Sequence, residues 1–218
     1  MKTMRNVLKF VTGFMVMACI STSSFGVESN YNPGGVSGQD FCDEIFRQIQ
    51  GIIPHLQGDI NPQTRQIKGG LHTIDSLASY NHISQHEYKS YKMKNGVIVI
   101  RFNDPDTVFN SGARKNMKAF ADNNKYYIPQ AKTLFPANWT QEKIADAIYS
   151  VVEDSFDEGE ITLTPGGIFE DHIGKKTFTV TKNIEGVDIT VAFGGGRMVS
   201  TYPIWMDDYL FESVDSFY

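Results

Sequence analysis

Apolar residues recur at the spacing of an α-helix in two stretches of the chain. In the first, residues 39–53, the apolar face consists of Phe41, Ile45, Ile49 and Ile52. The second begins after Asn138 or Thr140, either of which can cap a helix, and its apolar face consists of Ile144, Ile148, Val151 and Val152. Positions three or four apart lie on one side of a helix, so each stretch predicts a helix that packs on a core.

After Glu160 the apolar period changes to two, which is typical of strands with one buried face. The strand candidates are residues 161–163, 177–184, 187–193 and 198–205. Residues 97–102 (VIVIRF) form an earlier and more continuous apolar run, which predicts a buried strand. Helical segments that precede a run of strands predict an α+β fold with antiparallel sheets.

The first 26 residues stand outside this pattern. Residues 1–9 are basic, residues 10–20 are an apolar run, and small polar residues follow. This order is typical of a signal peptide, and the apolar run is too short to cross a bilayer as a helix. We expect cleavage after Gly26, which makes the mature protein secreted or periplasmic. In the alternative, residues 16–19 (VMAC) resemble a bacterial lipobox, and Cys19 carries a lipid anchor.

The rest of the chain divides into three parts. Residues 27–37 are polar and contain Gly and Pro, so we expect a flexible leader. Residues 38–205 have the length of one ordinary domain. Residues 206–218 form an acidic C-terminal tail. We expect no segment of the mature chain to cross a membrane as a helix.

Charge and cysteine content exclude several kinds of protein. The formal net charge is −5, and residues 1–26 hold three basic residues and no acid, so their removal makes it −8. This counts against a broad nucleic-acid-coating surface but leaves room for a small basic site. After cleavage Cys42 is the single cysteine, which excludes an internal disulfide and a Cys-based zinc site.

Two histidines lie beside turn residues. His55 lies just past the predicted end of the first helix, and His72 closes a Gly69-Gly70 turn before a candidate helix at residues 72–80. A helix C-terminus favours a charged imidazole and an N-terminus disfavours it, so His55 fits a proton donor and His72 a base. Histidine titrates near neutral pH, so such a pair can carry out acid–base chemistry without a metal.

The other three histidines fit this chemistry less well. His82 and His86 lie four residues apart in a polar run, with no Glu or Cys at zinc-like spacing, so we expect solvated side chains and no metal site. His172 lies in the loop before the later strands and is the main rival for a catalytic histidine.

Four motifs together resemble the EndoU-like endoribonucleases. They are HLQGD at residues 55–59, GGLH at residues 69–72, KTLFPANWTQEKIADAI at residues 132–148 and VSTYP at residues 199–203. That superfamily includes placental-protein-11-like enzymes, the coronavirus uridylate-specific endoribonuclease and bacterial toxin domains. The resemblance covers roughly residues 40–205 and implies an α+β fold of the RNase A-like superfamily.

The resemblance also implies roles for individual residues. It makes His72 the general base, His55 the general acid and Lys132 the electrostatic stabiliser. The substrate-binding residues that it implies are Gly70, Ser200, Thr201 and Tyr202. The stretch between His72 and Lys132 is long, which leaves the lysine open between Lys132 and three others: Lys92, Lys94 and Lys125.

The implied reaction is cleavage of single-stranded RNA at uridine or another pyrimidine, which leaves a 2′,3′-cyclic phosphate. The resemblance implies no cofactor, with weak stimulation of the activity by Mn²⁺ as in some relatives. A toxin or effector of this kind would have an immunity protein as its partner. The alternative function is an exported RNA- or protein-binding module of the same fold that has lost turnover.

Overall fold

A computed structural model describes residues 37–79, 88–115, 131–204 and 212–213 of the chain. The predicted signal peptide, the leader up to residue 36 and most of the acidic tail lie outside these described residues. The same holds for His82, His86 and Lys125.

The described residues form helices and short antiparallel sheets. The helices are α2 (Gly38–Leu56), α3 (Ile74–Ser79), α4 (Pro105–Val108) and α6 (Gln141–Asp157). The strands of the first half are β1 (Asp59–Ile60), β2 (Ile67–Gly69), β3 (Tyr88–Lys92), β4 (Ile98–Phe102) and β5 (Ala131–Leu134). The strands of the second half are β6 (Ile161–Leu163), β7 (Phe169–Asp171), β8 (Phe178–Ile184), β9 (Val187–Gly194), β10 (Arg197–Pro203) and β11 (Glu212–Ser213). This arrangement confirms the predicted α+β class.

Helix α2 begins at a capping box and runs further than its sequence predicts. The Ser37 side chain accepts from the Asp40 N–H, and the Asp40 carboxylate accepts from the Ser37 N–H. The helix continues through Pro54 to Leu56, because Ile52 and Leu56 are both buried in the core. The predicted end at residue 53 is therefore wrong, and His55 lies inside the last turn of the helix.

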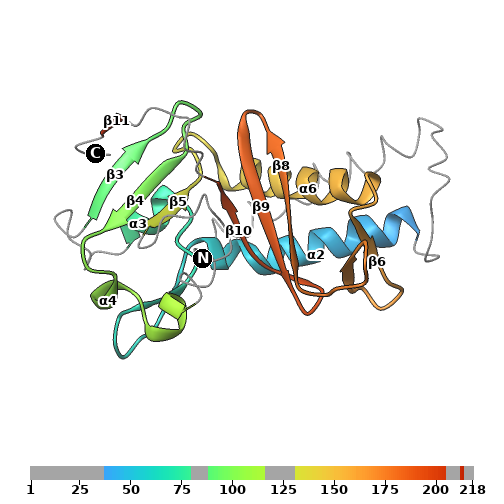
Figure 1. The fold of residues 1–218 in the computed structure, drawn as a ribbon, viewed down its shortest axis with the longest axis horizontal. Helices are drawn as coiled ribbons and strands as arrows, with labels where there is room; N and C mark the ends of the chain where they lie inside the picture. The colour runs from blue at the N-terminus through green and yellow to red at the C-terminus, as the bar shows by residue number, and fades with distance from the viewer. Residues whose placement is uncertain (1–36, 80–87, 116–130, 205–211, 214–218) are drawn as a thin grey trace, which may run out of the picture.

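Helix α6 lies beside α2 and covers the same core. Thr140 caps it by accepting from the Lys143 N–H at 3.2 Å, which confirms one of the two predicted caps. Its predicted apolar face is buried, with Ile148, Val151 and Val152 fully shielded from solvent. The two helices run side by side across one half of the molecule, in contact with each other and with the sheet of β8, β9 and β10 (Figure 1).

The sheet of β8, β9 and β10 is antiparallel, with β9 in the centre and β10 at one edge. The predicted strands 177–184, 187–193 and 198–205 correspond to it, with small changes at their ends. Gly195 and Gly196 both have positive φ, as the tight hairpin turn between β9 and β10 requires. The free edge of β10 contacts α2 and also approaches β5 of the other sheet.

The second sheet has the order β11-β3-β4-β5 and lies at the opposite end of the molecule (Figure 1). Its central strand, β4, matches the predicted apolar run. A separate core on one face of this sheet contains Ile67, Ile98, Ile100, Phe102 and Phe109. The sequence pattern did not predict β3, β5 and β7, nor the short pair β1 and β2. Within the described ranges, no helix has the length and apolarity to cross a membrane.

Candidate active site

His55 belongs to the last turn of α2, and its ring lies against the backbone of Gly69. A Cβ atom placed on Gly69 would be 2.8 Å from Cε1 of the His55 ring. The imidazole is half-buried. Any side chain at residue 69 would therefore displace the imidazole, so Gly69 keeps the space that the ring occupies.

The turn that follows brings the backbone even closer to α2. Gly70 has φ +72°, and a Cβ atom there would be 1.7 Å from the His55 carbonyl oxygen. This contact requires glycine on both steric and conformational grounds. Leu71 also has a positive φ, 68°, and is fully buried, so the surrounding packing holds it in a backbone conformation that a non-glycine residue rarely adopts.

His72 joins α2 to the strand β5. Its N–H donates to the Leu56 carbonyl at 2.9 Å, and its own carbonyl accepts from the Phe135 N–H at 2.9 Å. Its side-chain Nδ1 lies 2.9 Å from the carbonyl oxygen of Thr133. A carbonyl can only accept, so Nδ1 carries the proton, and in the neutral ring Nε2 is left with a free lone pair.

Lys132 lies on β5 opposite Ile100 of β4. Its Nζ lies 5.7 Å from the centre of the Phe109 ring, so an aromatic face is close to the ammonium. Burial lowers the pKa of Lys132 from 10.5 to about 8. The group is therefore mostly charged at neutral pH, and its charge is poorly screened by solvent.

These three groups act on one another. Burial first, and then the Lys132 ammonium, lower the pKa of His55, against the opposing effect of Asp59. Burial and Lys132 also lower the pKa of His72 well below 6.5, against its bond to the Thr133 carbonyl, and His55 lowers it further. Of the described lysines, Lys132 is the one whose charge acts on both imidazoles, whereas Lys92 and Lys94 are exposed.

One electrostatic expectation is wrong. The helix end was expected to favour charged His55, but the pKa of His55 is lowered because burial and the Lys132 charge act against protonation. For His72 the predicted direction is confirmed, although burial and Lys132 cause it. Sequence alone does not reveal either cause, because both depend on contacts between distant parts of the chain.

The side chains of three residues in the VSTYP motif, Ser200, Thr201 and Tyr202, do not all face the same way. The Tyr202 ring stacks on His72, with centroids 5.8 Å apart and planes at 29°. Ser200 and Tyr202 are both half-buried, and burial raises the pKa of Tyr202 to about 12. Thr201 is fully buried, and its hydroxyl donates to the Thr190 carbonyl at 3.0 Å. This bond ties β10 to β9, so the Thr201 side chain packs in the core and does not face the site.

The rival residues lie elsewhere. His172 is exposed, and its backbone N–H donates to Glu160 beside the hairpin of β6 and β7. Arg114, another basic residue of the described chain, pairs with Asp106. Gly69, the Thr133 carbonyl and Phe109 are the site components that sequence reasoning missed. Gly69 was visible in GGLH, but a backbone carbonyl and a distant phenyl ring leave no sequence signal.

The described residues contain no group of three or more His, Cys, Asp or Glu side chains that could hold a metal ion. His55 comes from α2, His72 from the turn before α3, Lys132 from β5 and Tyr202 from β10. The site therefore lies where the two sheets approach each other, at the end of α2.

Comparison with protein families finds a match over much of the chain. A family model described as bacterial EndoU nuclease matches residues 50–205. The matched segment contains His55, His72, Lys132 and Tyr202. Comparison with curated proteins and comparison with solved structures found no match.

Proposed function

Since this chain belongs to the bacterial EndoU nuclease family, and is therefore a nuclease, we propose that it cleaves single-stranded RNA at uridine or another pyrimidine. The proposed reaction is transesterification by the ribose 2′-hydroxyl. The observation that supports it best is the electrostatic coupling of His55, His72 and Lys132, which come from three separate parts of the chain.

His72 acts as the base in this proposal. Its Nε2 accepts the proton of the 2′-hydroxyl while the 2′-oxygen attacks the adjacent phosphorus. The Thr133 carbonyl fixes the tautomer that this step needs, and the lowered pKa of His72 keeps the ring neutral. A positioned base contributes about 10²–10⁴-fold to the rate.

His55 acts as the acid. As the bond between phosphorus and the 5′-oxygen breaks, the imidazolium gives its proton to the leaving oxygen. The products are a 2′,3′-cyclic phosphate and a 5′-hydroxyl end. DNA lacks the attacking hydroxyl and is not a substrate.

Lys132 stabilises the negative charge that gathers on phosphorus oxygens during the attack. A fixed donor or cation directed at such a charge is worth about 3 kcal/mol. Lys132 is half-buried and close to Phe109, so its ammonium interacts more strongly with a nearby negative charge than an exposed lysine would.

Ser200 and Tyr202 hold the base. The Ser200 hydroxyl can hydrogen-bond a pyrimidine edge, and Tyr202 offers an aromatic face already placed against His72. Stacking of this kind is worth about 1–3 kcal/mol per base. Gly70 leaves room for the backbone to approach the substrate phosphate.

Each chemical role in this scheme is filled by a side chain, so we propose a reaction that needs no metal. Activity is expected to persist in EDTA, with weak stimulation by Mn²⁺ at most. A complete loss of cleavage in EDTA that Mn²⁺ restores would contradict this part of the proposal.

The test of the proposed function is cleavage of a uridine-containing RNA oligonucleotide in EDTA by matched variants. His72→Ala and His55→Ala are each expected to lower kcat by at least about 10²-fold. His172→Ala, an exposed histidine outside the site, is the control and is expected to keep full activity. Intact RNA with the wild-type protein would end the nuclease proposal and favour a binding module. A dead His172→Ala variant beside an active His55→Ala variant would refute the assignment.

We also propose that the protein is exported, as a toxin or effector with an immunity protein as partner. The basic, apolar and small-polar order of residues 1–26 supports export. The N-terminal mass of the protein recovered outside the cytoplasm tests it: a start at Val27 supports secretion, and a lipid on Cys19 supports an anchored form. An intact Met1 start on that recovered protein would contradict both.

A further inference from the structure

Strand β10 changes the direction of its side chains between Met198 and Ser200. Met198 pairs with Phe193 of β9 and Ser200 pairs with its neighbour Ala192, so Val199 is an extra residue and forms a β-bulge. Met198 is buried before the bulge, whereas Thr201 and Pro203 are buried after it. Side chains along a strand alternate between two faces, so an extra residue shifts the alternation by one.

The bulge decides which residues of the VSTYP motif reach the site. Without it, Ser200 and Tyr202 would share the buried face of Met198, and Thr201 would point outward. With it, Thr201 enters the core, and Ser200 and Tyr202 lie on the half-buried face, where Tyr202 meets His72. The placement of both proposed base-binding residues therefore depends on this irregularity.

Gln48 of α2 holds the strand at the bulge. Its Oε1 accepts from the backbone N–H of Met198 at 2.7 Å, and its residue is 7% exposed. β10 is the edge of its sheet, so the Gln48 amide supplies an acceptor where a neighbouring strand would otherwise do so. A buried N–H without such an acceptor destabilises the structure around it.

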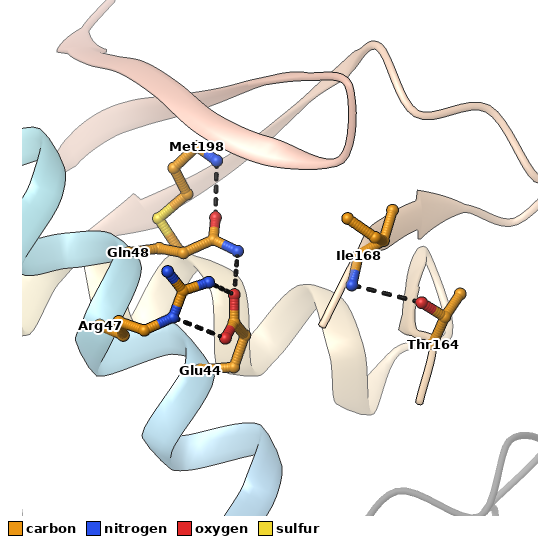
Figure 2. Close-up of polar contacts among 6 residues, drawn as sticks. All are labelled: Glu44, Arg47, Gln48, Thr164, Ile168 and Met198. Carbon is orange, nitrogen blue, oxygen red and sulfur yellow. Dashed lines mark hydrogen bonds and ion pairs between the residues drawn. The ribbon is translucent and has the colours of Figure 1, made fainter. Parts of the chain in front are cut away.

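Glu44 fixes the orientation of the Gln48 amide (Figure 2). Gln48 Nε2 donates to Glu44 Oε1 at 2.6 Å, and Arg47 donates to both oxygens of the same carboxylate, at 2.5 and 2.9 Å. A carboxylate cannot donate, so the nitrogen of the amide faces Glu44 and the oxygen faces Met198.

The turn between β6 and β7 also lies next to the Glu44 carboxylate. A Cβ atom on Gly167 would be 3.3 Å from the Glu44 carboxylate. The Ile168 N–H donates to the Thr164 Oγ1 at 3.2 Å and closes this turn, as Figure 2 shows. The Glu44–Gln48 pair is therefore held by its own helix, by a neighbouring turn and by β10.

We propose that Gln48 is a positioning residue for base recognition, because it holds the β10 bulge that directs Ser200 and Tyr202 toward the substrate. This inference rests on the proposed ribonuclease function. Gln48 lies about two turns before His55 on the same helix, so α2 positions both the acid and the strand that holds the base.

The test compares Gln48→Met with Gln39→Met in steady-state cleavage of RNA with one uridine or one adenosine. Methionine keeps the length of glutamine and removes its acceptor. Gln39 is exposed on the same helix, so Gln39→Met is the matched control. Gln48→Met is expected to raise KM for the uridine substrate about tenfold and to lower the preference for uridine over adenosine. Its kcat is expected to stay within about threefold, because His55, His72 and Lys132 keep their own supports.

A second pair of variants separates positioning from general loss of stability. Gln48→Glu keeps an acceptor for Met198 but places two carboxylates together. KM for the uridine substrate is therefore expected to rise, and the preference for uridine over adenosine is expected to fall. Adding Glu44→Gln to Gln48→Glu exchanges the two groups: the new amide donates to the new carboxylate, which still accepts from Met198. The double variant is expected to recover KM and base preference to within about threefold of wild type.

The possible outcomes are distinct. If the wild type does not cleave RNA, the proposed function fails. If the wild type cleaves and Gln48→Met matches Gln39→Met in KM and base preference, the positioning inference alone is overturned. If circular dichroism shows that Gln48→Met does not fold, Gln48→Glu and the double variant are compared instead. Recovery of KM and base preference in the double variant supports the inference, and no recovery overturns it.

Discussion

The His72 side chain is prepared for its proposed role by one hydrogen bond to the protein backbone. The Thr133 carbonyl accepts a hydrogen bond from Nδ1–H, which leaves Nε2 as an acceptor, while burial and Lys132 keep the ring uncharged. His55 has more exposure and a carboxylate, Asp59, that partly opposes the lowering of its pKa. The two imidazoles therefore differ in environment, as an acid and a base of one reaction must.

The first prediction concerns Gly69. In Gly69→Ala the new Cβ meets the His55 ring at 2.8 Å and pushes it aside, whereas the backbone needs no change. We expect kcat to fall by about ten- to hundredfold, because small displacements of a reacting group are costly. KM for RNA is expected to stay unchanged, since the residues that hold the base are untouched.

The control for this prediction is Gly51→Ala in the middle of α2, where a Cβ atom has no neighbour within 4 Å. It is expected to leave kcat unchanged and to raise the free energy of unfolding by about 0.5–1 kcal/mol. An unchanged kcat in Gly69→Ala would show that the His55 ring does not need its observed position.

The second prediction is the pH dependence of kcat/KM. The acid form of His55 is present below its lowered pKa, and the base form of His72 is present above its own, which is also lowered. Activity is therefore expected to peak on the acidic side of pH 6.5 and to fall as pH rises through the pKa of His55. An optimum well above pH 7 in the kcat/KM profile would contradict these roles.

The third prediction isolates the charge of Lys132. In Lys132→Met the positive charge next to both rings is lost, so the pKa of His55 is expected to rise toward 6.5 in an NMR titration of its ring protons. Lys143→Met removes a lysine that is paired with Glu185 outside the site, and is expected to leave that titration unchanged. Equal His55 titrations in wild type and Lys132→Met would mean that the ammonium lies too far away to act.

The site residues were predictable from sequence to different degrees. His55, His72 and Lys132 could be named because their motifs resemble those of a known family. The direction of the His55 pKa could not, because burial by Gly69 and the charge of Lys132 arise from folding. The burial of the Thr201 side chain could not be predicted either, because the bulge at Val199 shifts the alternation of side chains along β10.

Among the helices and strands, α2 and α6 both supply one buried face to the larger core. Both follow from their apolar spacing, and their starts follow from capping residues, Ser37 for α2 and Thr140 for α6. α2 has the additional task of carrying Gln48 and His55, so its rigidity links the core to the site. α6 contains none of the proposed site residues, so its stability can be changed without touching the chemistry.

The fourth prediction uses the α6 cap. Thr140→Ala removes the acceptor for the Lys143 N–H, and is expected to lower the free energy of unfolding by about 1 kcal/mol. Thr140→Ser keeps a hydroxyl, so its free energy of unfolding is expected to fall much less. Both variants are expected to keep the wild-type kcat at temperatures well below melting. Equal melting temperatures for Thr140→Ala and wild type would show that the cap contributes nothing.

Strands were predictable where apolar and polar residues alternate, as in β6, β8, β9 and β10, or where an apolar run is continuous, as in β4. β3 is mostly polar, because Lys89 and Lys92 are exposed, and β5 contains Lys132 directed into the site, so neither looks like a strand in sequence. Their positions are set by pairing with β4, which is a long-range effect.

The two sheets and the helix between them explain how an acidic protein can hold a basic site. The net charge is −5, yet Lys132 and the two imidazoles converge where β5 and β10 approach each other. In the proposed function this site binds one phosphate in a defined position and does not coat a nucleic acid. It therefore fits an enzyme that acts on single nucleotides in an exposed strand.

The most direct test is cleavage of a DNA oligonucleotide that contains one ribose, at a uridine, with the products identified by mass spectrometry. Attack by the 2′-hydroxyl predicts a single cut, directly after that uridine, and a 2′,3′-cyclic phosphate on the upstream fragment. Cleavage at deoxynucleotides, or an upstream fragment that ends in a 3′-hydroxyl, would contradict the proposed chemistry of His55 and His72.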